Sequence, residues 1–332
     1  MAPAVASPLT ISVALCTYNG AAYLDAQLDS LLAQQRRPDE IVVADDGSGD
    51  GTRERLRAFR ARAAQAGVEV TLIENAANLG YVRNFEQALA AARGALLFPC
   101  DQDDVWRADK LARMAVEFER RPELSLLHTD ARLVDAQGRP TGTTLFRALE
   151  ARRDELDALH AGRGFDVLLR RNLVTGATVG LRRELLAAAR PFPPELVHDE
   201  WLALIAAATG TVDALEDTLI DYRQHGGNQI GMRPRGLADK WEDLKRLRPE
   251  TLQRLAARMA LLGERLQRLG AAVPPAHLAR VRDKERHLRL RAALPPRGPA
   301  RLGVVLREAR GGGYARYSNG VRSMLRDLLR GD

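Results

Sequence analysis

The sequence predicts an α/β fold with a mostly parallel sheet and helices on both faces, followed by a helical, basic C-terminal region. Short apolar runs alternate with helical patterns over the first 120 residues, which is typical of a parallel sheet covered by helices. The charge also changes along the chain. Residues 1–230 carry 26 basic and 33 acidic groups, whereas residues 231–332 carry 24 basic and 10 acidic groups, so the last third forms a separate region.

The elements follow from the spacing of apolar residues. Apolar runs that end in polar or Gly-rich segments predict strands at 11–15, 40–44, 68–73 and 95–99. Helical spacing predicts helices at 24–32, 52–65, 81–92 and 106–120. Beyond these we expect short strands at 124–128, 178–181 and 218–222 and a helix that starts near Asp199.

Cysteine content and hydropathy bear on the compartment. The two cysteines, Cys16 and Cys100, are too few for a disulfide framework, so we expect a reducing, cytoplasmic environment. The N-terminal segment has no basic residues before its apolar run, which argues against a signal peptide. The uncharged stretch 201–212 is shorter than the roughly 20 residues of a spanning helix. If this protein meets a membrane, we expect it to lie on the surface.

Three polar clusters, at residues 16–20, 45–51 and 100–104, each follow a predicted strand. The carboxyl ends of parallel strands share one edge of a sheet, so we expect the clusters to converge there. The third contains three carboxylates in four positions, Asp101 to Asp104, which repel one another unless a cation is present. Mg²⁺ and Mn²⁺ take such oxygen ligands together with phosphates. A solvated acidic turn is the alternative.

The second cluster resembles a calcium loop, but Arg57 stands where the twelfth ligand should be Glu. A carboxylate there can instead accept the N3–H of uracil or thymine, and a plain Gly-rich turn is the alternative. Neither G-x-G-x-x-G after the first strand nor a P-loop motif occurs. Dinucleotide dehydrogenases and P-loop enzymes therefore lose their main support.

The ordered motifs resemble family 2 glycosyltransferases, which have the GT-A fold. They are Cys16-Thr17-Tyr18-Asn19-Gly20, Asp45-Asp46-Gly47-Ser48 with Asp50-Gly51-Thr52, Asn78-Leu79-Gly80 with Asn84, and Asp101 to Trp106. His198-Asp199-Glu200-Trp201 and the segment from Tyr222 to Asn228 resemble later motifs of a rhamnosyltransferase-like subset. The resemblance covers about residues 9–231, and Tyr317 to Gly320 and Arg326 to Leu329 extend it into the tail.

The resemblance implies a role for each motif residue. Asp46 would hold a pyrimidine, Asp101 the ribose, and Asp103 a divalent metal (Mn²⁺ or Mg²⁺) that bridges the donor diphosphate. Asp199 would be the catalytic base that deprotonates the acceptor hydroxyl, with inversion at the anomeric carbon. The other implied nucleotide-sugar contacts are Cys16, Tyr18, Asn19, Arg83, Gln102 and Arg223, and His225 is a further metal ligand. The implied acceptor side comprises Asp104, Trp106, Thr175, Gly176, Glu200 and Trp201.

Plainer alternatives stay open. Asp199 opens a predicted helix, where an acid is favoured by the helix dipole, and Glu200 is a backup base. His225 stands beside two glycines and can be an exposed loop residue. Thr175 and Gly176 can reflect close backbone packing.

The sequence therefore predicts an inverting, metal-dependent glycosyltransferase of bacterial surface polysaccharide synthesis. We expect a pyrimidine-diphosphate sugar as donor, dTDP-rhamnose first, and a glycan or lipid-linked oligosaccharide as acceptor. Residues 1–130 would bind the nucleotide sugar, residues 131–232 would complete the catalytic half, and residues 233–332 would form the helical tail. A non-catalytic sugar-nucleotide-binding or assembly subunit is the main rival, and a nucleotidyltransferase is another.

The tail has a broadly helical apolar pattern among Arg and Lys. We expect these helices first to pack on the domain or on a partner, including a homodimer, and second to rest on anionic membrane. No nucleic-acid recognition motif appears, so nucleic-acid binding ranks third and we expect no nucleic-acid partner. The apolar residues of this pattern are Trp241, Leu244, Leu247, Leu252, Leu255, Met259, Leu262, Leu266 and Leu269.

Overall fold

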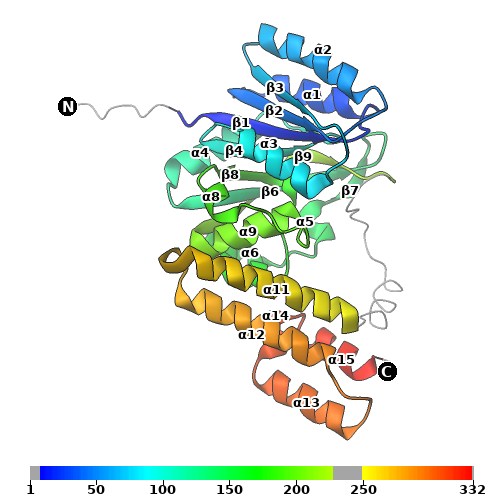
Figure 1. The fold of residues 1–332 in the computed structure, drawn as a ribbon, viewed down its shortest axis with the longest axis vertical. Helices are drawn as coiled ribbons and strands as arrows, with labels where there is room; N and C mark the ends of the chain where they lie inside the picture. The colour runs from blue at the N-terminus through cyan, green and yellow to red at the C-terminus, as the bar shows by residue number, and fades with distance from the viewer. Residues whose placement is uncertain (1–7, 227–248, 331–332) are drawn as a thin grey trace, which may run out of the picture. The chain divides into compact units, whose positions relative to one another are not determined.

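The computed structural model describes residues 8–226 and 249–330, and these form two compact units (Figure 1). The first unit comprises the chain up to Gly162, Leu173–Ala206 and the segment from Gly210. The second comprises Arg163–Asn172, Ala207–Thr209 and the C-terminal helices. Arg163–Asn172 and Ala207–Thr209, which lie within the predicted catalytic half at residues 131–232, therefore belong to the same unit as the C-terminal helices. Trp241, Leu244, Leu247 and the Gly227-Asn228 end of the late motif lie outside the described residues.

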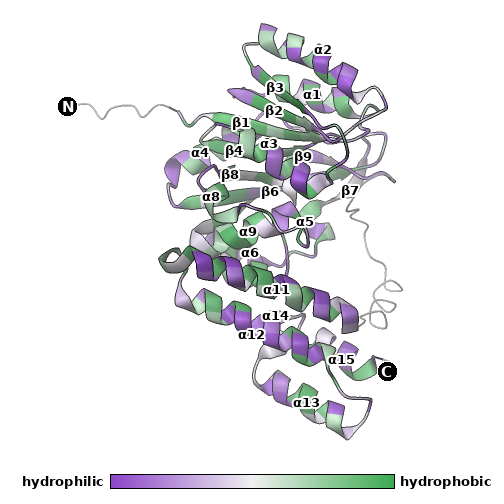
Figure 2. Cartoon of the chain, in the orientation of Figure 1, coloured by the Kyte–Doolittle hydropathy of each residue, from purple (hydrophilic) through white to green (hydrophobic). Residues whose placement is uncertain are grey.

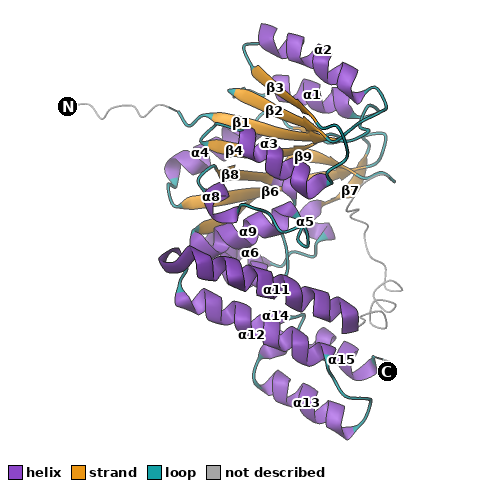
Figure 3. Cartoon of the chain, in the orientation of Figure 1, coloured by secondary structure: helices purple, strands orange, loops and turns teal. Residues whose placement is uncertain are grey.

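A nine-stranded sheet forms the centre of the first unit (Figure 3), and six of its strands, β1, β2, β3, β4, β6 and β9, run in the same direction. Its strand order is β3-β2-β1-β4-β8-β6-β9-β5, with β7 paired to β6. The pairs β1–β2, β1–β4, β2–β3 and β6–β9 are parallel, and the others are antiparallel. The strands are β1 (Ile11–Thr17), β2 (Glu40–Asp45), β3 (Glu69–Glu74), β4 (Leu96–Asp101), β5 (Val105–Trp106), β6 (Leu124–Val134), β7 (Pro140–Thr144), β8 (Val179–Arg182) and β9 (Thr211–Arg223).

Helices cover both faces of this sheet, as predicted. Ile11, Val13 and Leu15 of β1 pack in one core with apolar residues of three helices, α1, α2 and α4. Side chains alternate along a strand, so Ala14 faces the opposite side. Figure 2 shows the hydrophobic strands between helices of mixed hydropathy. The helices of this unit are α1 (Leu24–Leu32), α2 (Thr52–Gln65), α3 (Tyr81–Ala91), α4 (Lys110–Arg120), α5 (Leu145–Ala148), α6 (Arg153–His160), α8 (Leu185–Ala189) and α9 (His198–Thr209), whose last residues belong to the second unit.

The helix that we expected at 106–120 begins only at Lys110. Val105 and Trp106 instead form β5, which pairs antiparallel with Asp221 and Ile220 of β9. The Trp106 amide also donates to Ser30 Oγ at 3.1 Å. These backbone bonds hold the segment extended, so the end of the acidic loop is fixed by the sheet rather than by a helix.

The second unit is entirely helical within the described residues. Its longest helices, α11 (Pro249–Leu269) and α12 (Pro275–Ala292), pack together, with Met259 and Leu262 of α11 buried. Pro275 opens α12 and Pro299 opens the helix that follows it, at positions where the missing amide hydrogen costs nothing. The remaining helices are α7 (Gly164–Arg170), α13 (Pro299–Arg310), α14 (Gly313–Tyr317) and α15 (Val321–Leu329).

Within residues 8–226 and 249–330, none of the helices has the length and apolar character needed to cross a bilayer.

Candidate functional site

The three polar clusters converge at one edge of the sheet. Gln102, after β4, accepts from the Tyr18 amide at 2.8 Å and donates to the Tyr18 carbonyl at 3.0 Å. Asn19 is held in the left-handed region, with φ of 48°, and its amide donates to Ser48 Oγ at 2.9 Å. A Cβ on Gly20 would lie 2.1 Å from Gln102 Oε1, so the glycine leaves room for the Gln102 side chain in this hydrogen-bonded position. Gln102 and Asn19 therefore join the loops through hydrogen bonds within the protein.

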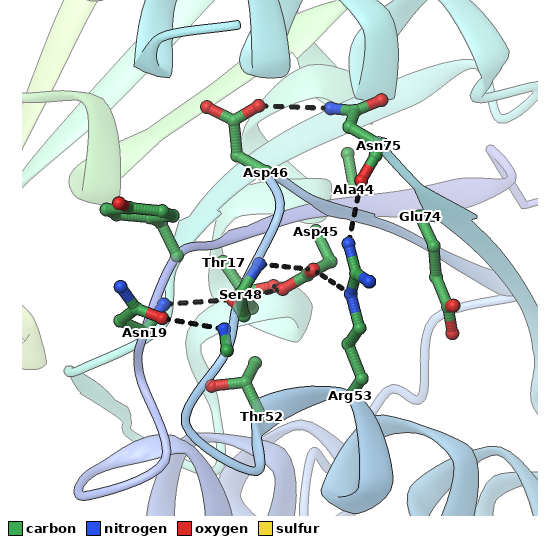
Figure 4. Close-up of polar contacts among 12 residues, drawn as sticks. Thr17, Asn19, Ala44, Asp45, Asp46, Ser48, Thr52, Arg53, Glu74 and Asn75 are labelled. Atoms are coloured by element: carbon green, nitrogen blue, oxygen red, sulfur yellow. Dashed lines mark hydrogen bonds and ion pairs between the residues drawn. The ribbon is translucent and has the colours of Figure 1, made fainter. Parts of the chain in front are cut away.

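The paired aspartates after β2 have different surroundings (Figure 4). Asp45 is buried and accepts from Thr17 Oγ1 at 2.9 Å and Arg53 Nε at 2.8 Å, and these bonds lower its pKa despite burial. It is a structural anchor of the loop. Asp46, in contrast, faces the segment that follows β3.

Asp46 Oδ1 accepts from the Leu79 amide at 2.8 Å and from Asn75 Nδ2 at 3.1 Å. Its Oδ2 accepts from the Gly80 amide at 3.0 Å. The side chain thus fixes the loop before α3 and is 2% exposed. A carboxylate offers about four acceptor positions, so Oδ2 keeps capacity for one more donor such as a pyrimidine N3–H.

Three carboxylates, Asp101, Asp103 and Asp104, lie close together at the end of β4 and in the acidic loop that follows it, and nearby positive charges offset their repulsion only in part. Burial, with the charges of Asp103 and Asp199, raises the pKa of Asp101 to about 7. Burial also raises the pKa of Asp104 well above its ordinary value, with the Asp103 and Asp101 charges adding to the effect. Asp104 Oδ1 accepts from the Arg223 amide at 2.9 Å, while Oδ2 is buried without a hydrogen-bond partner among the described residues. The site therefore has the electrostatic character expected of a cation or ligand site.

Lys110 is a feature of the site that sequence reasoning missed. Its ammonium is fully buried, donates to the Ala177 carbonyl at 2.7 Å and lies 3.7 Å from the centroid of the Trp106 ring. Burial lowers its pKa to about 7, while the charges of Asp104 and Asp101 act in the opposite sense. Lys110 is the first residue of the amphipathic helix α4, and lysine side chains are almost always exposed to solvent. Its residue type therefore gave no reason to expect it in the site.

Asp199 lies near the start of α9, and two backbone amides hold its carboxylate. Gly176 donates to Oδ2 at 2.9 Å and Glu200 donates to Oδ1 at 2.6 Å. Burial nevertheless raises the pKa of Asp199 to about 6. Because its charge contributes to the raised pKa of Asp101, the two carboxylates lie in one electrostatic environment. A buried carboxylate with a raised pKa is the type of group that can serve as a general base.

The end of β9 closes over the acidic loop. Arg223 is buried, and its Nε donates to the Asp103 carbonyl at 2.7 Å. Its guanidinium carbon lies 5.0 Å from the Tyr23 ring centroid. His225 Nε2 lies 2.7 Å from Asp103 Oδ2, and the His225 ring stacks on Tyr23 with centroids 4.6 Å apart. His225 is therefore no isolated surface residue.

Two of the residues expected on the acceptor side have buried side chains. Trp106 is 3% exposed and packs in the core of the sheet. Trp201 is 1% exposed, and its Nε1–H donates to the Ala189 carbonyl at 2.7 Å. Neither ring presents a surface to an acceptor, because burying a large aromatic stabilises the fold more than exposing it.

The neighbouring acceptor-side residues lie beside Asp199. The Thr175 carbonyl accepts from the Thr178 amide at 2.9 Å, and a Cβ on Gly176 would lie 2.7 Å from His198 Nε2. Gly176 is thus required for close packing, while its amide orients the base. Glu200 is partly exposed next to that base.

The remaining expected nucleotide contacts differ in accessibility. Tyr18 is 45% exposed at the site edge. Arg83 is largely exposed and pairs with Glu86 at 2.7 Å. Cys16 has a buried thiol, and burial raises its pKa well above the ordinary value. Cys16 therefore contributes a neutral, buried side chain rather than an ionised ligand.

Residues 12–174, which contain this sheet edge, match the family described as Glycosyl transferase family 2. This matched segment, about half of the chain, is of the glycosyl transferase family 2 type. The described late segments of the chain, Asp199 and Arg223 to His225, lie beyond the matched range, and they interact with Asp101 and Asp103 of the matched segment.

Curated relatives match part of this chain. An uncharacterized protein of Mycobacterium tuberculosis is 29% identical over 218 residues, which cover 65% of this chain and 59% of that protein. The match thus spans about three fifths of the relative's length. A UDP-Glc:alpha-D-GlcNAc-diphosphoundecaprenol beta-1,3-glucosyltransferase of Escherichia coli is 26% identical over 125 residues, 38% of this chain and 47% of that enzyme.

Solved structures have the same fold. TarS of S. aureus (residues 1–349, with UDP-GlcNAc) has a TM-score of 0.59 at 18% identity, covering 96% of this chain and 90% of that one. The mannosyltransferase PcManGT of Pyrobaculum calidifontis, with GDP-Man and Mn²⁺, has a TM-score of 0.55 at 18% identity, covering 98% and 86%. At this identity the likeness establishes the GT-A-like fold.

The family 2 site offers a small metal-ligand set. Within the described parts of the chain, no cluster of three or more His, Cys, Asp or Glu side chains is arranged to hold a metal by itself. Asp103 and His225 do form a pair of ligand type at 2.7 Å. Mg²⁺ and similar ions are commonly held by one or two carboxylates together with substrate phosphates. These two protein ligands therefore fit a metal ion that a bound diphosphate would also coordinate.

Proposed function

We propose that this protein is an inverting, metal-dependent glycosyltransferase that uses a nucleoside diphosphate sugar to build a bacterial surface polysaccharide. The observation that carries the proposal is the placement of Asp199. Two backbone amides orient its buried carboxylate, and its charge contributes to the raised pKa of Asp101 in the acidic loop. These observations support a role for Asp199 as the base that acts beside this loop.

In the proposed reaction Asp199 takes the proton of an acceptor hydroxyl. That oxygen forms a bond to the anomeric carbon of the donor while the bond from this carbon to the diphosphate breaks, so the configuration inverts. The nucleoside diphosphate leaves with the electron pair. Asp103 and His225 would hold a divalent ion, which when bound neutralises charge on the leaving diphosphate.

The donor and acceptor are proposed from weaker support. The remaining acceptor capacity of Asp46 is compatible with the N3–H of uracil or thymine, and dTDP-rhamnose is the first donor to test because of the motif resemblance. The E. coli relative is named for a lipid-linked diphosphoundecaprenol acceptor, and TarS was solved with UDP-GlcNAc. We therefore propose a glycan or a lipid-linked oligosaccharide as acceptor.

The direct test is turnover with Mn²⁺ or Mg²⁺ and a panel of UDP-, dTDP- and GDP-sugars, with and without acceptor extracts. We expect release of the nucleoside diphosphate and a product with inverted anomeric configuration. Donor binding without turnover under any acceptor condition would favour the non-catalytic rival. A retained configuration would exclude Asp199 as the base of a single displacement.

Asp103→Asn tests the metal assignment. We expect it to abolish the increase in donor affinity that Mn²⁺ produces, because it removes the charged member of the Asp103–His225 pair. Asp109→Asn is the matched control, since Asp109 lies nearby in the sequence but pairs with Arg107 at 2.5 Å. Equal Mn²⁺ dependence in both variants would contradict the assignment.

A further inference from the structure

Helix α15 presents its apolar side to solvent and its polar side to the protein. Ser323 and Asp327 are buried, whereas Val321, Leu325 and Leu329 are 68%, 48% and 55% exposed. A helix on the surface of a globular protein normally has the reverse arrangement. Exposed apolar faces of this kind mark interaction surfaces.

A buried ion pair fixes the orientation of this helix. Asp327 accepts from Arg291 Nε at 2.6 Å and Nη2 at 3.1 Å, and from the Tyr314 hydroxyl at 2.7 Å. Rotating α15 to bury its leucines would remove Asp327 from these donors and leave Arg291 buried without its carboxylate. The outward apolar side is therefore a stable feature of the second unit.

Helix α13, which packs against α15, exposes two further leucines one turn apart. Leu302 is 45% exposed and Leu306 is 38% exposed. Five of the nine large hydrophobic side chains that are exposed among the described residues thus lie on these two helices. We call this set the C-terminal apolar face: Leu302, Leu306, Val321, Leu325 and Leu329.

The positive charge of the segment that carries this face indicates which kind of partner can bind there. Residues 299–330 contain seven arginines and two acidic residues. Arg301 and Arg330 are buried, and the other five arginines are at least partly exposed. Both acids are engaged within the unit, Asp327 with Arg291 and Glu308 with His287 at 2.7 Å. In a dimer formed through this face, the arginines of one copy would lie near the arginines of the other, and like charges oppose association. An anionic lipid surface instead complements them.

We propose that the C-terminal apolar face rests on an anionic phospholipid membrane, with its leucines at the acyl boundary and its arginines among the headgroups. Amphipathic helices bind such interfaces through the combination of apolar burial and attraction to anionic lipid. The binding is reversible because the apolar segments are short, and it is salt-sensitive because salt screens the attraction between the arginines and anionic lipid. This surface is independent of the donor site and would carry the enzyme to acceptors at the membrane.

Flotation of the full chain with phosphatidylcholine vesicles, with and without phosphatidylglycerol, tests the proposal. We expect binding only when phosphatidylglycerol is present, and loss of that binding at high salt. Replacing Val321, Leu325 and Leu329 together by Ser should weaken binding more than about tenfold. Arg322→Gln should weaken it about fivefold.

The matched control is Val116→Ser, because Val116 is 39% exposed on α4 of the first unit. It should bind vesicles like the unmodified protein. Circular dichroism and thermal unfolding check that the variants fold. If the triple variant unfolds, Val321→Ser alone replaces it, since Val321 is the most exposed of the five.

Light scattering after size-exclusion chromatography tests whether a second copy of the chain, rather than a membrane, covers the face. A dimer that the triple variant converts to monomer, with no vesicle binding, would assign the face to a second copy and overturn the proposal. Absence of both vesicle binding and a dimer would also overturn it. Release of nucleoside diphosphate from soluble donor, measured without vesicles, reports on the proposed enzyme activity separately.

Discussion

The first unit buries several carboxylates near one another, whereas the second unit buries an aspartate against an arginine. In the first, burial and mutual repulsion raise the pKa values of Asp101 and Asp104. In the second, Asp327 is fully buried and makes a two-point pair with Arg291. Buried charges that are paired stabilise the structure, while a cluster of carboxylates whose repulsion Lys110 offsets only in part indicates a place for a ligand. The difference separates the site of chemistry from the framework.

Asp199→Asn should give the largest effect on activity. Asparagine keeps the shape but cannot take a proton, so we expect kcat to fall about 10²–10⁴-fold. Donor affinity, measured by calorimetry, should stay unchanged because Asp199 acts on the acceptor. Glu200→Gln is the control, and it should retain most of the activity. A large, equal loss of donor binding in Asp199→Asn would place Asp199 in the donor site instead.

Arg291→Met tests the paired charges of the second unit. It leaves Asp327 buried without its countercharge, which typically costs about 3–5 kcal/mol of the free energy of unfolding. Arg289→Met is the control on the same helix, because its pair with Glu285 is largely exposed on the arginine side. Such pairs contribute about 0.3–0.5 kcal/mol. Similar denaturation midpoints for both variants would mean that the buried pair does not hold the unit together.

Sequence patterns predicted the parts of this structure that depend on local order. The apolar runs located the strands, and the polar residues after β1, β2 and β4 had to meet because those strands are parallel neighbours. The position of Asp199 near Asp101 was predicted only through the resemblance. Nothing in the spacing indicated how the chain returns to the sheet edge.

Features that depend on distant partners escaped prediction. Lys110 is buried because its ammonium reaches Ala177, 67 positions away in sequence. The polar side of α15 faces inward because Arg291 and Tyr314 provide donors for Asp327. Periodicity identifies the apolar side of a helix, but the ion pair decides which side is covered. The tail motifs around Ser318 and Asp327, which carried no chemistry in the sequence, thus stabilise the second unit.

Lys110→Met probes the connection between the acidic loop and the base. It removes a buried hydrogen bond and leaves the Ala177 carbonyl without its donor, which costs about 1–3 kcal/mol in the free energy of unfolding. Ala177 follows Gly176, whose amide orients Asp199. We therefore expect kcat to fall more than the KM for acceptor changes. Steady-state kinetics on folded protein provide the measurement, and a loss confined to stability would limit Lys110 to a structural role.

The pH dependence of kcat should show the smallest but most specific effect. Burial raises the pKa of Asp199 to about 6, and a general base acts only when deprotonated. Activity should therefore be full above that pH and fall about tenfold for each pH unit below it. The residual activity of Asp199→Asn should lack this step, because asparagine does not titrate. A rate that instead rises as the pH falls through 6 would mean that the reaction needs a protonated carboxylic acid. Asp199 would then act as a general acid rather than as the base.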